Sequence, residues 1–466
     1  MNYYSYSATG DIPNPTNGFF YQPRQYAPVA SVVREGGGTQ NRHVNNGRAS
    51  NRGSSGWTTG VGVVALTGPA VPASTGSRGS SAMCYFDNAA STSILPEVLE
   101  AMIPMFTENY GNPEASHHAG KLARDIMEDC REQIANAFEV EANEIYFTSG
   151  ASESVNTFIR GVAQSNCDRK RRKLVMSAIE HKAVSATCLN LEKEGYDVVT
   201  VPVTAGGIID LRALTNAVDQ NTLLVCVIMA NNEVGVLQPI EQVARIAHAN
   251  GALLFSDTTQ IAGKLTIHPK KLGIDALCIS GHKIHGPKGV GALYMSSNIE
   301  CAPIMTGGHQ ERGQRAGTSN TPGIAGLAAA IRKNLSPQGQ QLQRLVKQKK
   351  DWVETELVHG LPEGCVTVHC AESPRINTVS SIGVVDASGN PIDKAEMMRY
   401  LNANNIVVSA GSACNAGSDR SDVLEAIGVT PNMESCTLRI SLSALTTWPE
   451  CQQLVNAIKN RVVQYE

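Results

Sequence analysis

The sequence predicts an α/β protein, in which a mostly parallel sheet is covered by helices on both faces and a smaller α+β domain follows. Strand-like segments alternate with helical stretches over roughly 200 residues after Cys84. These segments are short and apolar, as is typical of strands buried on both faces. Beyond Leu342, a helical stretch leads into further strand-like segments, which predict the smaller domain.

The elements follow from hydrophobic periodicity. The expected strands of the large sheet are residues 144–148, 173–177, 196–201, 222–229, 252–256 and 276–280. Apolar residues recur every fourth position from Leu122 to Phe138, which predicts an amphipathic helix with Cys130 on its buried side, and residues 240–249 predict another helix. The expected C-terminal strands are residues 366–369, 378–385, 406–409 and 437–442, followed by a helix near Pro449 that Thr447 caps.

Composition divides the chain into three parts. Residues 1–82 contain long Gly, Asn, Ser and Arg stretches with few groups to bury, so we expect a disordered extension. This extension holds six Arg, no Lys and two acids; a passive tail is the simplest interpretation, with a targeting segment or an RNA-contacting tail as alternatives. Residues 83–342 are expected to form the large domain, with the first residues packing on the small domain, residues 343–466.

Bulk properties exclude several classes of protein. A chain of 466 residues that is 42% hydrophobic can bury a sizeable core, and its net charge of −3 argues against a nucleic-acid-coating protein. We find no apolar run of the ~20 residues that a membrane-spanning helix needs. The twelve cysteines include no C-x-x-C pair, so we expect reduced thiols and no metal site. The start of the chain lacks a basic amphipathic helix, which favours the cytoplasm over mitochondria.

Polar residues follow three of the expected strands. Residues 145–150 (IYFTSG) precede a helix, and a glycine turn at a helix N-terminus suits a phosphate, although many such turns bind nothing. Asp257 ends one apolar strand, and Lys283 follows the next. Because ligands bind at the carboxyl ends of parallel strands, we expect these groups to meet.

Two interpretations of Asp257 and Lys283 are open from the residues alone. They can form a structural ion pair. Alternatively, Lys283 forms a Schiff base with pyridoxal phosphate while Asp257 keeps the pyridine nitrogen protonated, which lets the cofactor act as an electron sink. Ser280 and His282, beside the lysine, supply further donors for the phosphate.

Short motifs along the chain support the second interpretation. They are residues 88–92 (NAAST), 111–113 (GNP), 147–153 (FTSGASE), 180–181 (EH), 231–235 (NNEVG), 257–260 (DTTQ), 280–289 (SGHKIHGPKG), 307–318 (GGHQERGQRAGT) and 411–414 (GSAC). In these motifs the chain resembles the cysteine desulfurase and selenocysteine lyase family, a class V aminotransferase-type branch of the fold type I enzymes that use pyridoxal phosphate. The likeness runs in unbroken order from about residue 84 to 466.

The resemblance implies roles for individual residues. Lys283 matches the lysine that binds the cofactor and removes the Cα proton, and His181 matches an imidazole that stacks on the ring, although a lone histidine is more often a core residue. The resemblance also implies the remaining contacts: Asp257 to the pyridine nitrogen, Gln260 to the phenolic oxygen, Ala151, Ser152, Ser280 and His282 to the phosphate, Thr318 to the phosphate of the other subunit of a homodimer, Asn232 to cofactor and substrate, and Arg439 to the substrate carboxylate.

Cys414 is the expected nucleophile among the twelve cysteines. It lies in a segment of small polar residues without apolar periodicity, which suits a movable thiolate better than a core residue. Cys226 and Cys278, in contrast, lie inside apolar strands. We expect Cys414 to take sulfur from L-cysteine as a persulfide, leaving L-alanine, and to pass it to an acceptor such as an iron–sulfur scaffold protein.

Alternatives to this activity differ in substrate or class. L-Selenocysteine is the close alternative substrate: residues 229–233 and 317–326 look closer to the lyases, whereas residues 409–414 look closer to the desulfurases. An ordinary aminotransferase would lack the cysteine segment, and an inactive scaffold would be expected to lose Lys283 or Cys414. The sequence departs from the family at Thr258 and Thr259, where small residues are usual, at residues 415–416, and at residues 443–444.

Overall fold

The computed structural model describes residues 83–166, 171–411 and 420–464. The predicted extension, residues 1–82, and Cys414 lie outside the described residues. Within the described ranges, no helix has the length and apolar character needed to cross a membrane.

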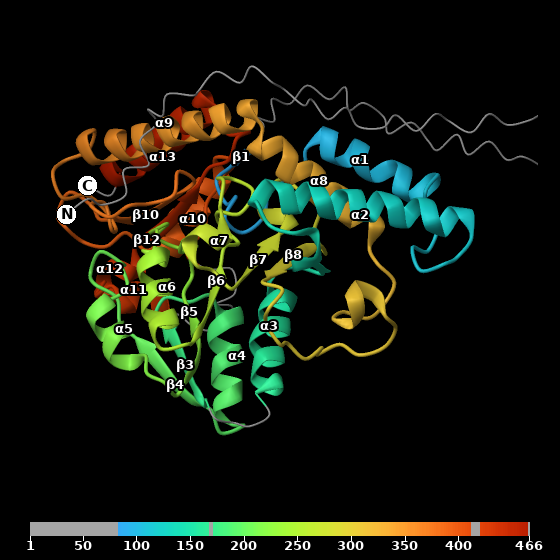
Figure 1. Ribbon diagram of the computed structural model, residues 1–466. Coiled ribbons are helices and arrows are strands. Elements are labelled where there is room, and N and C mark those ends of the chain that lie inside the picture. The colour runs from blue at the N-terminus through green and yellow to red at the C-terminus, as the bar shows by residue number, and fades with distance from the viewer. Residues whose placement is uncertain (1–82, 167–170, 412–419, 465–466) are drawn as a thin grey trace, which may run out of the picture. The chain divides into compact units, whose positions relative to one another are not determined.

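A seven-stranded sheet forms the centre of the larger part, and the prediction of a mostly parallel sheet is confirmed (Figure 1). Its strands lie in the order β2-β8-β7-β6-β5-β3-β4, and β3 to β7 run parallel to their neighbours within that group. Their bounds are β2 Ile145–Thr148, β3 Lys173–Ser177, β4 Asp197–Val201, β5 Thr222–Cys226, β6 Leu253–Asp257, β7 Ala276–Ser280 and β8 Gly291–Met295.

Strands β2, β4 and β6 differ from their expected bounds by one residue, and two larger differences concern β5 and β8. Strand β5 ends at Cys226 and not at Met229, because its register with β6 stops at the Cys226–Phe255 pair. Strand β8 was not predicted, and it runs antiparallel to both β7 and β2. Its antiparallel direction follows from its position, since the chain returns from β7 after a short connection with no crossover helix.

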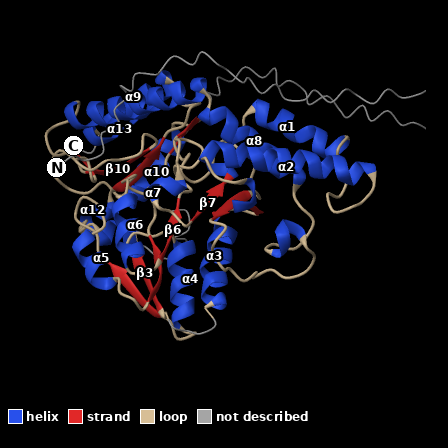
Figure 2. Cartoon of the chain, in the orientation of Figure 1, coloured by secondary structure: helices blue, strands red, loops and turns tan. Residues whose placement is uncertain are grey.

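Helices cover both faces of this sheet (Figure 2). Val225 and Leu254 face a core that includes residues of α2, α6 and α8, whereas Leu224 and Phe255 face a core that includes residues of α3 and α4. Alternate residues of each strand therefore enter opposite cores, as in a doubly covered sheet. The helices are α1 Pro96–Thr107, α2 His118–Phe138, α3 Ala151–Ser165, α4 Lys182–Glu192, α5 Leu211–Ala217, α6 Ile240–Ala249, α7 Pro269–Leu272 and α8 Thr321–Leu335.

A second sheet and its own core lie toward the C-terminus. The antiparallel strands β12-β10-β9 pack with α9, α10 and α13, and the two-stranded pair β1-β11 adds Cys84 and Ile406 to the same core. Helix α13 begins with a capping box between Thr447 and Glu450, so the predicted cap is confirmed. The bounds are β1 Cys84–Tyr85, α9 Pro337–His359, β9 Val366–Val368, β10 Val379–Val384, α10 Lys394–Ala403, β11 Ile406–Val407, α11 Asp422–Ala426, α12 Pro431–Ser435, β12 Thr437–Ser441 and α13 Trp448–Val463. The division at residues 342–343 stays a prediction.

Candidate active site

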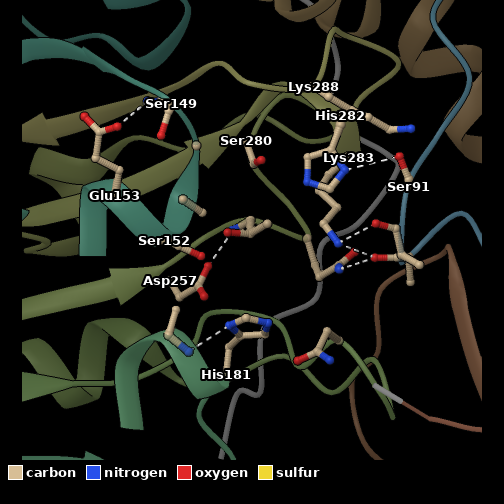
Figure 3. Close-up of a pocket in the computed structure, with 18 of the residues that line it drawn as sticks. Ser91, Ser149, Ser152, Glu153, His181, Asp257, Ser280, His282, Lys283 and Lys288 are labelled. Carbon is tan, nitrogen blue, oxygen red and sulfur yellow. Dashed lines mark hydrogen bonds between the residues drawn. The ribbon is translucent and has the colours of Figure 1, made fainter. Parts of the chain in front are cut away.

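A cavity of about 440 Å³ lies at the carboxyl ends of β6 and β7, where Asp257 ends one strand and Lys283 follows the other (Figure 3). The short helix η2, Gly281–Lys283, turns the chain there. Ten of the twelve predicted site residues line this cavity: Ala151, Ser152, His181, Asn232, Asp257, Gln260, Ser280, His282, Lys283 and Arg439. The tertiary structure thus brings together residues that are distant in the chain, such as Ala151 and Arg439, which lie 288 positions apart.

The Lys283 ammonium contacts the segment that precedes α1. Its Nζ donates hydrogen bonds of 2.7 Å to the carbonyl oxygen of Ala89 and 2.9 Å to that of Ala90 (Figure 3). The amide of Gln260 donates to the same Ala89 oxygen at 3.0 Å. A lysine held by main-chain oxygens is directed into the cavity and is available to a ligand that replaces these acceptors.

Asp257 and His181 form another part of the wall. Asp257 is buried, and its Oδ1 accepts hydrogen bonds from Thr259 N–H at 2.9 Å and from the Cys278 thiol at 3.3 Å. His181 caps helix α4, and its Nδ1 accepts a 3.1 Å hydrogen bond from Ala183 N–H. Burial lowers the pKa of His181; Asp257 opposes this effect and Lys283 adds to it. The imidazole is therefore neutral at pH 7, with its proton on Nε2.

The turn between β2 and α3 has the features of a phosphate site. Gly150 has a φ of +151°, which favours glycine, and the N–H groups of the first turn of α3 have no acceptor within the helix. The hydroxyl of Ser280 lies 3.8 Å from where a Cβ on Gly150 would stand. Burial, Lys283 and Lys288 lower the pKa of His282 to about 4, so its ring is neutral at pH 7. The dipole of α3 and these neutral donors suit an anion.

Glu153 also lies in the first turn of α3, where its charge would oppose an anion. Its carboxylate is paired with Arg315 at 2.9 Å and accepts the Ser149 N–H at 2.9 Å. Burial raises the pKa of Glu153, but the contacts with Arg315 and Ser149 outweigh it, and the net pKa is lowered. The negative charge is thus compensated by a loop arginine.

Arg439 lies on β12 and also lines the cavity. Its Nη1 donates to the carbonyl oxygen of Asn232 at 3.0 Å, and its Nη2 donates to Asp87 Oδ1 at 2.9 Å and to Ser409 Oγ at 3.3 Å. Its buried Nε has no hydrogen-bond partner in the described part of the chain. The guanidinium is thus oriented by the protein while one of its donors is unsatisfied.

The described residues on both sides of segment 412–419, which contains Cys414, contact this same wall. Before the segment, Ser409 exchanges two main-chain hydrogen bonds with Arg439, of 3.1 and 2.7 Å. After it, the hydroxyl of Ser421 donates to Glu233 Oε2 at 2.6 Å, next to Asn232. Cys414 itself lies outside the described residues, so its predicted role stays a prediction.

Thr318 is the other predicted site residue that does not line the cavity. It is exposed and lies in the loop that leads to α8. Its contact with a phosphate in another subunit stays a prediction.

The cavity also includes residues to which sequence reasoning gave no individual role: Ala89, Ala90, Ser91, Ser149, Glu153, Thr259, Lys288 and Gly289. All of them lie inside the motifs that carry the family resemblance. The side chains of Ala89 and Ala90 could not indicate their contacts, because main-chain oxygens make them. The sequence did indicate Thr259, because a β-branched residue with a hydroxyl replaces a small residue at that position.

Comparisons with known proteins identify the family of this chain. The family model "Aminotransferase class-V" matches residues 84–454. The cysteine desulfurase IscS of Methanosarcina thermophila is 38% identical over 375 residues, covering 80% of this chain and 90% of the relative. A solved structure described as a NifS-like protein has a TM-score of 0.75 at 33% identity, covering 82% of this chain and 100% of that one. Another, described as SspA in complex with cysteine, has a TM-score of 0.67 at 34% identity, covering 78% and 99%. This chain therefore belongs to the cysteine desulfurase family, a pyridoxal-phosphate-dependent group within the class-V aminotransferases.

Proposed function

We propose that the protein is a pyridoxal-phosphate-dependent cysteine desulfurase, which converts L-cysteine to L-alanine and leaves the sulfur as a persulfide on Cys414. The observation that carries this proposal is the shared cavity of Lys283, Asp257 and Arg439. The Lys283 amine can bind the cofactor covalently, and the Asp257 carboxylate can pair with the protonated ring nitrogen. The Arg439 guanidinium can bind the carboxylate of the amino-acid substrate. The solved relative that is described as a complex with cysteine supports the choice of substrate.

The residues of the cavity fit pyridoxal phosphate. Asp257 Oδ2 has no donor in the described part of the chain, so it can accept from the protonated ring nitrogen. The first turn of α3, with Ser152 and Ser280, would hold the phosphate, and Gln260 would contact the phenolic oxygen. Lys283 would hold the cofactor covalently through Nζ. When bound, the cofactor supplies an electron sink for the electrons of the substrate Cα–H bond.

The residues of this chain would carry the remaining steps. Arg439 binds the substrate carboxylate, and its bidentate fork orients the amino acid. Lys283 takes the Cα proton once its Nζ is released by the substrate amine. The Cys414 thiolate attacks the substrate sulfur: the S–S bond forms as the Cβ–S bond breaks, and the carbon skeleton takes up a proton and leaves as alanine.

We further propose that the protein acts as a homodimer. Helix α1 and the residues after it leave Leu99, Ile103, Phe106 and Tyr110 between 45% and 73% exposed, which is an apolar surface of the kind that subunit interfaces cover. The exposed Thr318 would then contact the phosphate in the other subunit. Size-exclusion chromatography with light scattering tests the subunit number, and Phe106→Glu should yield monomers.

The acceptor of the persulfide would be a separate protein, such as an iron–sulfur scaffold, and the cytoplasm remains the proposed compartment.

The central experiment incubates the purified protein and pyridoxal phosphate with L-cysteine, in the presence of a reductant, and measures alanine and sulfide. The two products should form in equal amounts. Production of pyruvate or transfer of the amino group, without sulfide, would contradict the proposal. Initial rates with L-selenocysteine serve as the comparison: rapid turnover of selenocysteine beside negligible turnover of cysteine would assign the protein to the lyases.

A further inference from the structure

Asp257 and Cys278 are register partners on the parallel strands β6 and β7. Their side chains meet at the end of that register, where the Cys278 thiol lies 3.3 Å from Asp257 Oδ1. Both residues are buried, at 3% and 0% exposure. A carboxylate has acceptors only, so the thiol is the donor in this contact.

Thr259 completes a closed set of contacts around the same oxygen. Its main-chain N–H donates to Asp257 Oδ1 at 2.9 Å, and its hydroxyl lies 3.6 Å from Cys278 Sγ. Since the thiol proton is directed to Asp257, the sulfur can accept the proton of the threonine hydroxyl. Burial and the neighbouring Asp257 raise the pKa of the Cys278 thiol, which keeps its proton in place for donation.

Oδ1 accepts both of the hydrogen bonds that the Asp257 carboxylate receives from the described residues. Among the described residues, Oδ2 has no donor, and Asp257 lines the cavity with Thr259, whereas Cys278 does not. Two protein donors therefore hold Oδ1 in place. They oppose any rotation of the carboxylate that would turn Oδ2 away from the cavity.

We propose that Cys278, supported by Thr259, is a positioning residue that holds the Asp257 carboxylate so that Oδ2 faces the ring nitrogen of bound pyridoxal phosphate. This inference rests on the proposed function, since it assumes that the cavity binds this cofactor. A thiol is a weaker donor than a hydroxyl, so it orients the carboxylate while leaving most of its negative charge for the ring nitrogen.

Cofactor affinity of the apoprotein, measured by titration with pyridoxal phosphate, tests the proposal without relying on turnover. Cys278→Ala removes the donor and should weaken cofactor binding about tenfold, the loss of one hydrogen bond to a charged group. It should also shift the pH at which the absorbance of the bound cofactor changes. Cys278→Ser keeps a donor and should restore affinity to within about threefold of the wild type.

Cys226→Ala is the matched control. Cys226 is also 0% exposed and faces the same core, but its register partner on β6 is Phe255 and it does not line the cavity. This variant should lose comparable thermal stability, because it leaves a similar void, while its cofactor affinity stays unchanged. Equal losses of affinity in Cys226→Ala and Cys278→Ala would overturn the proposal, since they would indicate a packing effect alone.

A double-mutant cycle tests the part played by Thr259. Thr259→Val keeps the shape and the main-chain donor but removes the hydroxyl, and should weaken affinity by about threefold. In the Cys278→Ala background the same change should have no further effect, because its acceptor is gone; additive losses would contradict the cooperation of the two side chains. Wild-type affinity and spectrum in Cys278→Ala would overturn this inference alone, whereas a wild-type protein that does not bind pyridoxal phosphate would overturn the proposed function as well.

Discussion

Arg439 and Asp87 form a salt bridge of 2.9 Å across 352 residues of sequence, and the arginine side chain is 3% exposed while the carboxylate is 21% exposed. The bridge joins strand β12 to the segment after β1, so the first described residues help to orient the guanidinium. Asp87 is therefore a support for the proposed substrate-binding group, and its role could not be predicted from the residues beside it.

Arg439→Lys should raise the KM for L-cysteine by about tenfold to a hundredfold, with a smaller effect on kcat. An ammonium cannot reproduce a two-pronged contact with a carboxylate. Steady-state kinetics check this, and the spectrum of the bound cofactor should be unchanged. Arg160→Lys, at an exposed salt bridge with Glu194, is the control and should behave as the wild type.

Lys283→Ala should abolish covalent attachment of pyridoxal phosphate. Reduction with borohydride followed by peptide mapping should place the pyridoxyl group of the wild-type protein on Lys283. Lys288 also lines the cavity, and Lys264 lies near Gln260, so both are the relevant alternatives. A pyridoxyl group on either of these residues would refute the assignment.

Cys414→Ser should abolish alanine formation from L-cysteine while the cofactor still binds and its spectrum still responds to substrate. A serine hydroxyl is a poor attacking group for sulfur, and cofactor binding does not need the thiol. Cys370→Ser is the control, because Cys370 is a partly exposed cysteine that does not line the cavity. Normal turnover by Cys414→Ser would assign the chemistry to another cysteine.

Arg131→Met should destabilise the protein by about 3–5 kcal/mol, because it leaves Glu311 as a buried charge without its partner. Arg131 donates to both carboxylate oxygens of Glu311, at 2.7 and 2.9 Å, and both side chains are at most 3% exposed. Urea denaturation measures the change. At the exposed pair of Lys347 and Asp351, Lys347→Met should cost less than about 1 kcal/mol.

His369→Gln should make the protein less sensitive to acid. Burial lowers the pKa of His369 to about 4, so between pH 6.5 and 4 the unfolded state takes up a proton that the folded state does not. Stability therefore falls as the pH drops through this window, and the loss due to this residue is at most about 3 kcal/mol at pH 4. Glutamine can keep the contact with Thr437 Oγ1, which is 3.0 Å from His369 Nε2.

Denaturation curves of His369→Gln and the wild type at pH 7.5 and pH 4.5 provide the measurement. The stability difference between the two pH values should be smaller in the variant. His248→Gln is the control, since the His248 side chain is 43% exposed. An unchanged pH dependence in His369→Gln would show that this histidine does not contribute to acid sensitivity.

The sequence by itself determined the alternation of strands and helices and the identities of Asp257 and Lys283 as strand-end groups. Apolar periodicity is local, so β3, β7 and α6 have the predicted bounds. The family resemblance named ten residues that share one cavity, although their roles remain proposals.

Only the tertiary structure decided which groups surround those residues. The carbonyl oxygens of Ala89 and Ala90 accept hydrogen bonds from Lys283, which lies 194 and 193 positions away in the chain. Cys278 lies beside Asp257 because the two residues are register partners on parallel strands. The direction of β8 was decided in the same way, by its pairing with β7 and β2. These contacts join main-chain atoms and side chains that are distant in sequence, and such pairs leave no periodic signal in the segments that make them.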